Sequence, residues 1–124
     1  MNGITGIHHA SVVVSDLARA LRFYVDVLGI EVDTSRPSMP YDGAWLQLGD
    51  QQIHLLQLPN PDPVVDRPEH AGRDRHTALT VRGLEAVVSR LGQAGIAMTH
   101  SRSGRRAVFC RDPDGNGIEL IETG

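Results

Sequence analysis

Three histidines and one glutamate lie at matching places in two similar stretches of the chain. His9 and His76 each open a run of residues with high β-propensity, and His54 and Glu119 each lie inside a later apolar run. Imidazole nitrogens and carboxylate oxygens are ligands that suit a divalent ion such as Zn, Ni, Co, Mn or Fe(II). No short local metal-binding motif is present, so a metal site is indicated only by the matched positions of these four residues. We therefore predict that His9, His54, His76 and Glu119 hold one divalent metal ion per site.

Alternation along the predicted strands determines where these side chains point. His54 and Glu119 each have an apolar residue on both sides in the sequence. Because successive side chains of a strand point to opposite faces, the apolar neighbours can pack against helices while the polar residues face the concave side of the sheet. The same alternation puts His9 and Ser11 on that side. His8 would point to the other face, which makes it the weaker candidate ligand.

The elements that position these residues repeat once along the chain. Residues 9–17 (HASVVVSDL) match residues 76–84 (HTALTVRGL) at an offset of 76 − 9 = 67, and each stretch leads into a segment with apolar residues at helical spacing. Two strand-like runs follow in each copy. The turn between them contains Gly49–Asp50 in the first copy and Asp112–Gly115 in the second.

This pattern predicts an α+β fold built from two paired βαβββ modules. We place the first module at about residues 4–58 and the second at about 72–123, within a single domain that spans 1–124. The linker between them, residues 59–71, contains Pro59, Pro61, Pro63 and Pro68. Because proline fixes φ and lacks an N–H donor, we expect this linker to be an extended, non-helical strap.

Composition and charge exclude several classes of protein. The 124 residues are 40% hydrophobic and 22% charged, as in globular proteins, and the net charge of −3 argues against a nucleic-acid-binding or membrane-surface protein. We see no membrane span and no secretion signal, so we expect a cytoplasmic protein. Cys110 is the only cysteine, which excludes an intrachain disulfide and a cysteine-based zinc site. His70 and His100 lie in polar contexts and are expected to be solvated.

Several other side chains are candidates for substrate binding. Arg73 and Arg75 lie just before the first predicted strand of the second module, and Arg105 and Arg106 form another basic pair. Guanidinium groups match carboxylates, phosphates and the anion of a thiol cofactor. We predict Arg73, Arg75 and Arg105 as substrate-binding residues, the alternative being a solvated, charged loop. Trp45 is a further candidate for the wall of the pocket, although a lone strand tryptophan is more often a core residue.

Together these features resemble the vicinal oxygen chelate superfamily, which includes glyoxalase I, methylmalonyl-CoA epimerase, extradiol dioxygenases, and fosfomycin- and bleomycin-resistance proteins. The resemblance covers nearly the whole chain and rests on residues 9–17, 22–29, 53–55, 76–81 and 112–120. It implies that the paired modules form an open, barrel-like mixed sheet around a metal ion, with helices on the outside. It also implies a homodimer, in which each site takes His9 and His54 from one chain and His76 and Glu119 from the other.

The resemblance further implies a metal-dependent lyase or isomerase of the glyoxalase type. The ion would polarise two vicinal oxygens of a small substrate and stabilise an enediolate. Glu119 is the candidate catalytic base if it loosens from the metal, and a metal-bound hydroxide is the alternative base. An Fe(II) extradiol-type dioxygenase and a fosfomycin- or bleomycin-like resistance protein remain the other two hypotheses.

Two residues depart from the patterns of the family. His54 stands where glyoxalase-like enzymes usually carry Glu or Gln, and as a fourth ligand it fills a position that a dioxygenase needs open for its substrates. Phe109 stands where fosfomycin transferases tend to have a tyrosine. Because all four ligand positions are kept, the sequence argues against a metal-free binding protein.

Overall fold

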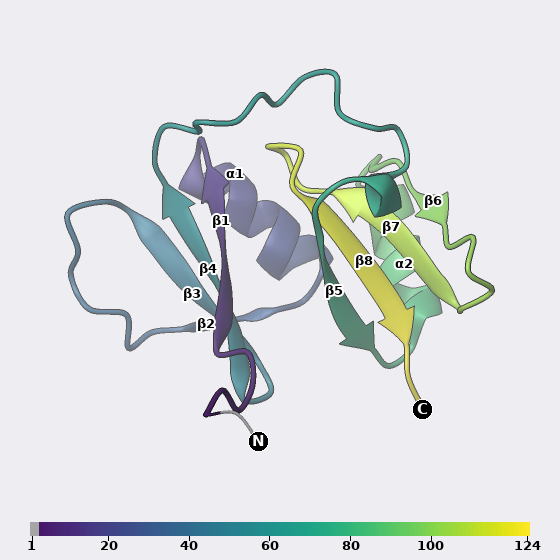
Figure 1. The fold of residues 1–124 in the computed structure, drawn as a ribbon, viewed down its shortest axis with the longest axis horizontal. Helices are drawn as coiled ribbons and strands as arrows, with labels where there is room; N and C mark the ends of the chain where they lie inside the picture. Colours follow the sequence, from purple (N-terminus) through teal and green to yellow (C-terminus); the bar gives the residue numbers. More distant parts are fainter. Residues whose placement is uncertain (1–2) are drawn as a thin grey trace.

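The fold consists of two four-stranded mixed sheets, one from each half of the chain (Figure 1). It is seen in a computed structural model that describes residues 3–124. The first sheet contains β1 (His9–Val14), β2 (Glu31–Asp33), β3 (Gly43–Leu48) and β4 (Gln51–Gln57), and the second contains β5 (His76–Val81), β6 (Thr99–His100), β7 (Ala107–Arg111) and β8 (Gly117–Glu122). The strand orders are β1-β4-β3-β2 and β5-β8-β7-β6. The predicted α+β fold of two βαβββ modules is confirmed.

The two sheets also match in strand register. In the first sheet β1 runs parallel to β4 with Ser11 opposite His54, and in the second β5 runs parallel to β8 with Ala78 opposite Glu119. The antiparallel neighbours β3 and β7 each place an aromatic residue opposite the polar residue of β4 or β8. Trp45 is opposite His54, and Phe109 is opposite Glu119. The sequence repeat therefore extends to the environment of each central polar residue.

The first helical segment differs from the single amphipathic α-helix that the apolar spacing suggests. Helix α1 (Leu17–Leu21) is capped by the Asp16 side chain, which accepts a hydrogen bond from the Arg19 N–H at 3.1 Å, and it continues into a π-helical segment, η1 (Arg22–Val27). In this segment the Leu28 N–H donates to the Phe23 carbonyl, five residues earlier, at 3.0 Å. The wider turn buries both Phe23 and its neighbour Tyr24.

The second helix, α2 (Leu84–Gln93), buries Leu84, Val87 and Leu91 along one face. These residues belong to the same apolar cluster as Phe23 of η1, so one hydrophobic core joins the two modules. Burial of this apolar surface is the main force that holds the modules together. The apolar residues on either side of His54 and Glu119 are also in this cluster, as strand alternation predicts: Ile53, Leu55, Ile118 and Leu120.

A buried polar cluster links the turn between β7 and β8 to the first module. The Tyr24 hydroxyl donates to Asp112 Oδ2 at 2.7 Å, and Asn116 Nδ2 donates both to the same oxygen, at 2.8 Å, and to the Val13 carbonyl, at 3.0 Å. Burial raises the pKa of the Asp112 carboxyl. We call Tyr24, Asp112 and Asn116 the Asp112 cluster.

The linker runs over the top of the molecule in Figure 1, from the end of β4 to the start of β5. It has no regular structure until a short 3-10 helix, η2 (Ala71–Arg73), immediately before β5. Among the helices of residues 3–124, none has the length and apolar character needed to cross a membrane.

Cys110 lies in the core, and its burial predicts how its thiol reacts. Burial raises the pKa of its thiol to about 12, so the native thiol stays protonated and unreactive. The thiol therefore leaves the stability of the fold unaffected below its unfolded pKa, near 9. As the pH rises from there towards 12, the free energy of unfolding decreases, because only the unfolded chain readily loses the proton. We expect labelling by a thiol-specific disulfide reagent at pH 8 to be slow and to accelerate when denaturant unfolds the protein. Rapid labelling of the native protein would contradict this environment.

Candidate metal-binding site

His76 and Glu119 lie side by side on neighbouring strands of the second sheet. His76 opens β5 and Glu119 is in the middle of β8, and His76 Nε2 lies 3.2 Å from Glu119 Oε1. Opposite His76 is Gly117, where a Cβ atom would come within 2.8 Å of the Arg75 carbonyl oxygen and 3.0 Å of the His76 Cβ. The absence of a side chain at Gly117 thus allows the close approach that brings His76 to Glu119.

The hydrogen bonds of His76 determine which ring nitrogen is free. Its Nδ1 lies 2.9 Å from the Asp74 carbonyl oxygen. Because a carbonyl oxygen only accepts hydrogen bonds, Nδ1 must carry the proton, and in a neutral ring Nε2 then presents a lone pair. This lone pair faces a Glu119 oxygen, so the contact requires a proton or a cation between two electron-rich atoms.

The second oxygen of Glu119 is also incompletely satisfied. The Glu119 residue is only 2% exposed, and its Oε2 has no hydrogen-bond partner among residues 3–124. Arg105 Nη2 lies 3.3 Å from Oε2 without hydrogen-bond geometry, and the Arg105 side chain is 58% exposed. Arg105 thus compensates part of the charge of this buried carboxylate, and a metal cation would also supply the partner that Oε2 lacks.

The pair opens into a pocket of about 280 Å³ in which positively charged residues predominate. Arg73 and Arg105, both predicted substrate-binding residues, line it. Arg75 lies outside this pocket and pairs with Asp62 at 3.0 Å. The complete lining is His70, Gly72, Arg73, His76, Ser101, Arg102, Ser103, Arg105, Phe109 and Glu119.

His70 is not a solvated loop residue, so that expectation was wrong. It is half-buried, its Nδ1 lies 2.7 Å from the Thr99 hydroxyl, and its ring packs edge-on against Phe109 with 4.7 Å between ring centroids. The contact partners come from distant parts of the chain, so no local pattern indicated this position. His100 is exposed, as expected.

The other two predicted ligands form an aromatic stack on the first sheet. The His54 ring lies between His9, with a centroid distance of 3.9 Å and an interplanar angle of 16°, and Trp45, with 4.8 Å and 11°. Trp45 is therefore on the site face of the sheet rather than in the core. His8 lies next to this stack, because its Nδ1 is 2.8 Å from His9 Nδ1.

The hydrogen bonds of the Gln52 side-chain amide determine which ring nitrogen of His54 carries the proton. Gln52 Nε2 donates to Asp33 Oδ2 at 2.8 Å, so Gln52 Oε1 must be the atom 2.8 Å from His54 Nε2. His54 Nε2 therefore carries a proton and Nδ1 is left with the lone pair. Burial and then the neighbouring His9 lower the pKa of His54, which favours the neutral form that a metal ligand needs.

The four predicted ligands form two pairs rather than one cluster within a chain. His9 and His54 lie on the first sheet, and His76 and Glu119 on the second. In the part of the chain that the structure describes, residues 3–124, no group of three or more His, Cys, Asp or Glu side chains is close enough to hold one ion. Each chain therefore contains two separate pairs of predicted ligands.

The sequence profile of the Glyoxalase/Bleomycin resistance protein/Dioxygenase superfamily matches residues 6–120. YaeR of Escherichia coli K12 is 30% identical over 98% of this chain and 99% of its own length, and a lactoylglutathione lyase of Haemophilus influenzae is 30% identical over 94% of this chain and 91% of its own. Among solved structures, the E126Q mutant of the fosfomycin-resistance protein FosX of Listeria monocytogenes has a TM-score of 0.75, with 98% of this chain and 94% of that chain covered. At 18% identity this last likeness concerns the fold alone. By its sequence profile and its fold, the chain belongs to the Glyoxalase/Bleomycin resistance protein/Dioxygenase superfamily.

Proposed function

We propose that this protein is a metal-dependent lyase or isomerase of the glyoxalase type that acts on a small substrate with vicinal oxygens. The observation that carries the proposal is the His76–Glu119 pair, in which a ring-nitrogen lone pair faces a buried carboxylate that has an unpartnered oxygen. A divalent cation satisfies both groups at once. The 30% identity to a protein named lactoylglutathione lyase supports the class of reaction.

The donor set fits a divalent ion of the Zn, Ni, Co, Mn or Fe group. His76 and His54 each have one ring nitrogen held as a donor by a hydrogen-bond partner and the other left with a lone pair, as is usual for metal-binding histidines. His9 differs, because its ring is stacked on His54 and the lone pairs of parallel rings do not converge. His9 therefore needs another rotamer to share an ion with His54.

We further propose that the complete ligand set forms between two copies of the chain, with His9 and His54 from one copy and His76 and Glu119 from the other. The support is the separation of the two pairs within one chain. Mixing a His54→Ala chain with a Glu119→Gln chain should then regenerate metal binding, because a heterodimer contains one intact site and one doubly altered site. Failure of the mixture to bind metal, although subunits exchange, would contradict a shared site, and so would a strictly monomeric protein in sedimentation.

The residues of the pocket have distinct expected roles in the reaction. When bound, the divalent ion would polarise two adjacent substrate oxygens and so acidify a neighbouring C–H bond. Glu119 is the candidate base, since its Oε2 has no hydrogen-bond partner to give up. Arg73 and Arg105 line the same pocket and would hold an anionic group of the substrate. Trp45 packs against the ligand His54 and would form the opposite wall.

Elemental analysis of the purified protein, followed by a substrate screen, tests the proposed function. Bound Ni, Zn or Co together with turnover of hemithioacetals supports the lyase or isomerase. Bound iron with O₂ consumption on catechols would replace it by the dioxygenase alternative. Thiol addition to fosfomycin, or ligand affinity without turnover in a protein that refuses metal, would replace it by an antibiotic-resistance protein.

Arg105 is expected to affect metal and substrate in opposite directions. Its guanidinium lies 3.3 Å from Glu119 Oε2, so in Arg105→Met a competing cation is lost. Because the Arg105 side chain is solvent-exposed and screened, we expect the metal to bind more tightly by roughly 1.5–5-fold. The same variant should show a higher KM for an anionic substrate. Arg106→Met is the matched control, because Arg106 pairs with Glu85 at 2.9 Å outside this pocket. Weaker metal binding in Arg105→Met would contradict the prediction.

A further inference from the structure

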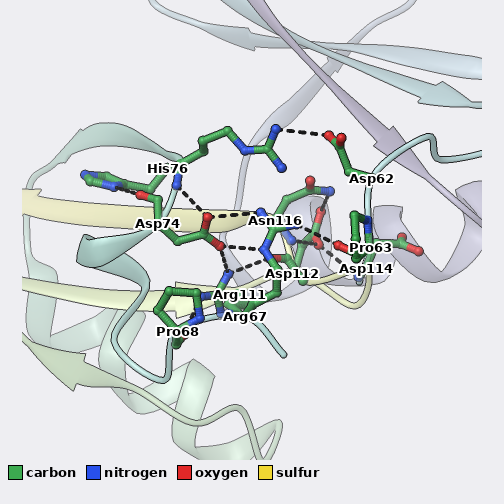
Figure 2. Close-up of polar contacts among 12 residues, drawn as sticks. Asp62, Pro63, Arg67, Pro68, Asp74, His76, Arg111, Asp112, Asp114 and Asn116 are labelled. Carbon is green, nitrogen blue, oxygen red and sulfur yellow. Dashed lines mark hydrogen bonds and ion pairs between the residues drawn. The ribbon is translucent and has the colours of Figure 1, made fainter. Parts of the chain in front are cut away.

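The carboxylate of Asp74 accepts hydrogen bonds from two arginine side chains and one backbone N–H group (Figure 2). Arg67 binds it with two nitrogens, Nε to Oδ2 at 2.8 Å and Nη2 to Oδ1 at 3.1 Å. Arg111 Nη1 donates to Oδ2 at 2.9 Å, and the Arg75 backbone N–H donates to Oδ1 at 2.8 Å. The Asp74 side chain is only 12% exposed, so these contacts are shielded from solvent and define one conformation.

The three charged residues come from three different parts of the fold. Arg67 belongs to the linker, and its Nη1 also donates to the Pro63 carbonyl at 2.8 Å. Arg111 ends β7, and its Nη1 also donates to the Gly115 carbonyl in the β7–β8 turn at 2.7 Å. Asp74 itself lies between η2 and β5. One carboxylate thus fastens the linker and the turn to the segment that leads into His76.

The backbone of Asp74 is what contacts the predicted metal ligand. Its carbonyl oxygen accepts the hydrogen bond from His76 Nδ1, at 2.9 Å. This hydrogen bond keeps the proton on Nδ1 and directs Nε2 towards Glu119. A histidine side chain in water favours the other tautomer, in which Nε2 carries the proton. In that tautomer, the nitrogen that faces Glu119 has no lone pair for a metal ion. The orientation of the Asp74 peptide therefore determines whether His76 can act as a ligand through Nε2.

We propose that Asp74 is a positioning residue, whose carboxylate, held by Arg67 and Arg111, fixes the backbone conformation that selects the Nδ1–H tautomer of His76. This inference rests on the proposed function in one respect, namely that His76 binds the metal through Nε2. Metal affinity then depends on Asp74 as well, although Asp74 is not one of the predicted ligands. Partners of this kind that orient a ligand typically change metal affinity by about 10–100-fold when they are lost.

The test uses the full chain as wild type, Asp74→Asn and Arg67→Gln. Long-range ¹⁵N–¹H correlation spectra of the metal-free protein at pH 8, with the His76 signals assigned by their loss in His76→Gln, report the tautomer directly. In wild type we expect a protonated Nδ1, with Nε2 sharing a proton with Glu119 in the absence of metal, and in both variants a mixture with the form that is protonated on Nε2 alone. Titration with Zn²⁺ against a chromophoric chelator should show about 10–100-fold weaker binding in both variants. Arg67→Gln carries the test alone if Asp74→Asn does not fold.

Glu85→Gln is the matched control, because it also converts an acid to an amide beside an arginine, in the exposed Arg106–Glu85 pair. It should change neither the tautomer nor the Zn²⁺ affinity. Folded Asp74→Asn and Arg67→Gln variants that keep both the wild-type tautomer and the wild-type affinity would overturn the inference. A wild-type protein that binds no Zn²⁺ would instead contradict the proposed function, and the tautomer comparison would still decide the role of Asp74.

Discussion

The His76→Ala variant is expected to lose stoichiometric metal while remaining folded. The substitution removes one of the two predicted ligands on the second sheet and leaves Glu119 without its 3.2 Å partner. Since the loss of a residue that merely orients a ligand weakens binding by about 10–100-fold, the loss of the ligand itself should exceed that range. Metal content per chain after dialysis, measured by mass spectrometry, provides the test.

His100→Ala is the control for this experiment, because His100 is exposed and is not among the residues that line the pocket of Glu119. It should retain the full metal content. Circular dichroism should show wild-type secondary structure for both variants, since the His76 side chain is not part of the apolar core. Full metal content in His76→Ala would refute the assignment of this residue as a ligand.

Asp112→Ala should produce the largest loss of stability of the variants considered. The Asp112 carboxylate accepts hydrogen bonds from the Tyr24 hydroxyl and Asn116 Nδ2, and from the backbone N–H groups of Asp114 and Asn116. Its removal leaves several donors without a partner in a buried region that links the modules. We expect a decrease of about 3–5 kcal/mol in the free energy of unfolding, measured by urea denaturation.

Glu85→Gln serves as the reference for stability as well, since an exposed ion pair contributes only about 0–1 kcal/mol. Tyr24→Phe should fall between the two variants, because it removes one hydrogen bond of 2.7 Å and keeps the aromatic ring in the core. A decrease below about 1 kcal/mol for Asp112→Ala would show that water or a rearranged turn can replace the carboxylate.

The fold was predictable because its determinants are local and occur twice. The runs that start at His9 and His76 combine strand alternation with helical spacing, and both patterns depend on residues only a few positions apart. The π-helical segment η1 was not predictable in this way. Its apolar residues also fit an ordinary α-helix, and the wider turn is defined by how Phe23 and Tyr24 pack against distant residues.

The candidate site was predictable only in part, for a related reason. His54 and Glu119 stand out because each is a polar residue inside an apolar strand. Asp74 gave no such indication, because Arg73 and Arg75 on either side made it look like part of a solvated basic loop. Its partners Arg67 and Arg111 lie 7 and 37 residues away, in the linker and at the end of β7. Contacts of this kind depend on tertiary structure and leave no pattern in the sequence.

The hydrophobic core that joins the two modules has an evolutionary consequence. It is formed by the helices and by the apolar strand residues whose side chains point away from the predicted ligands. An exchange of a predicted ligand, such as a glutamate for the histidine at position 54, would therefore alter the face that carries the candidate site without disturbing the packing that keeps the polypeptide folded. Relatives can diversify in metal preference and substrate chemistry while retaining one architecture, as expected when activity resides in a few replaceable groups on a stable scaffold.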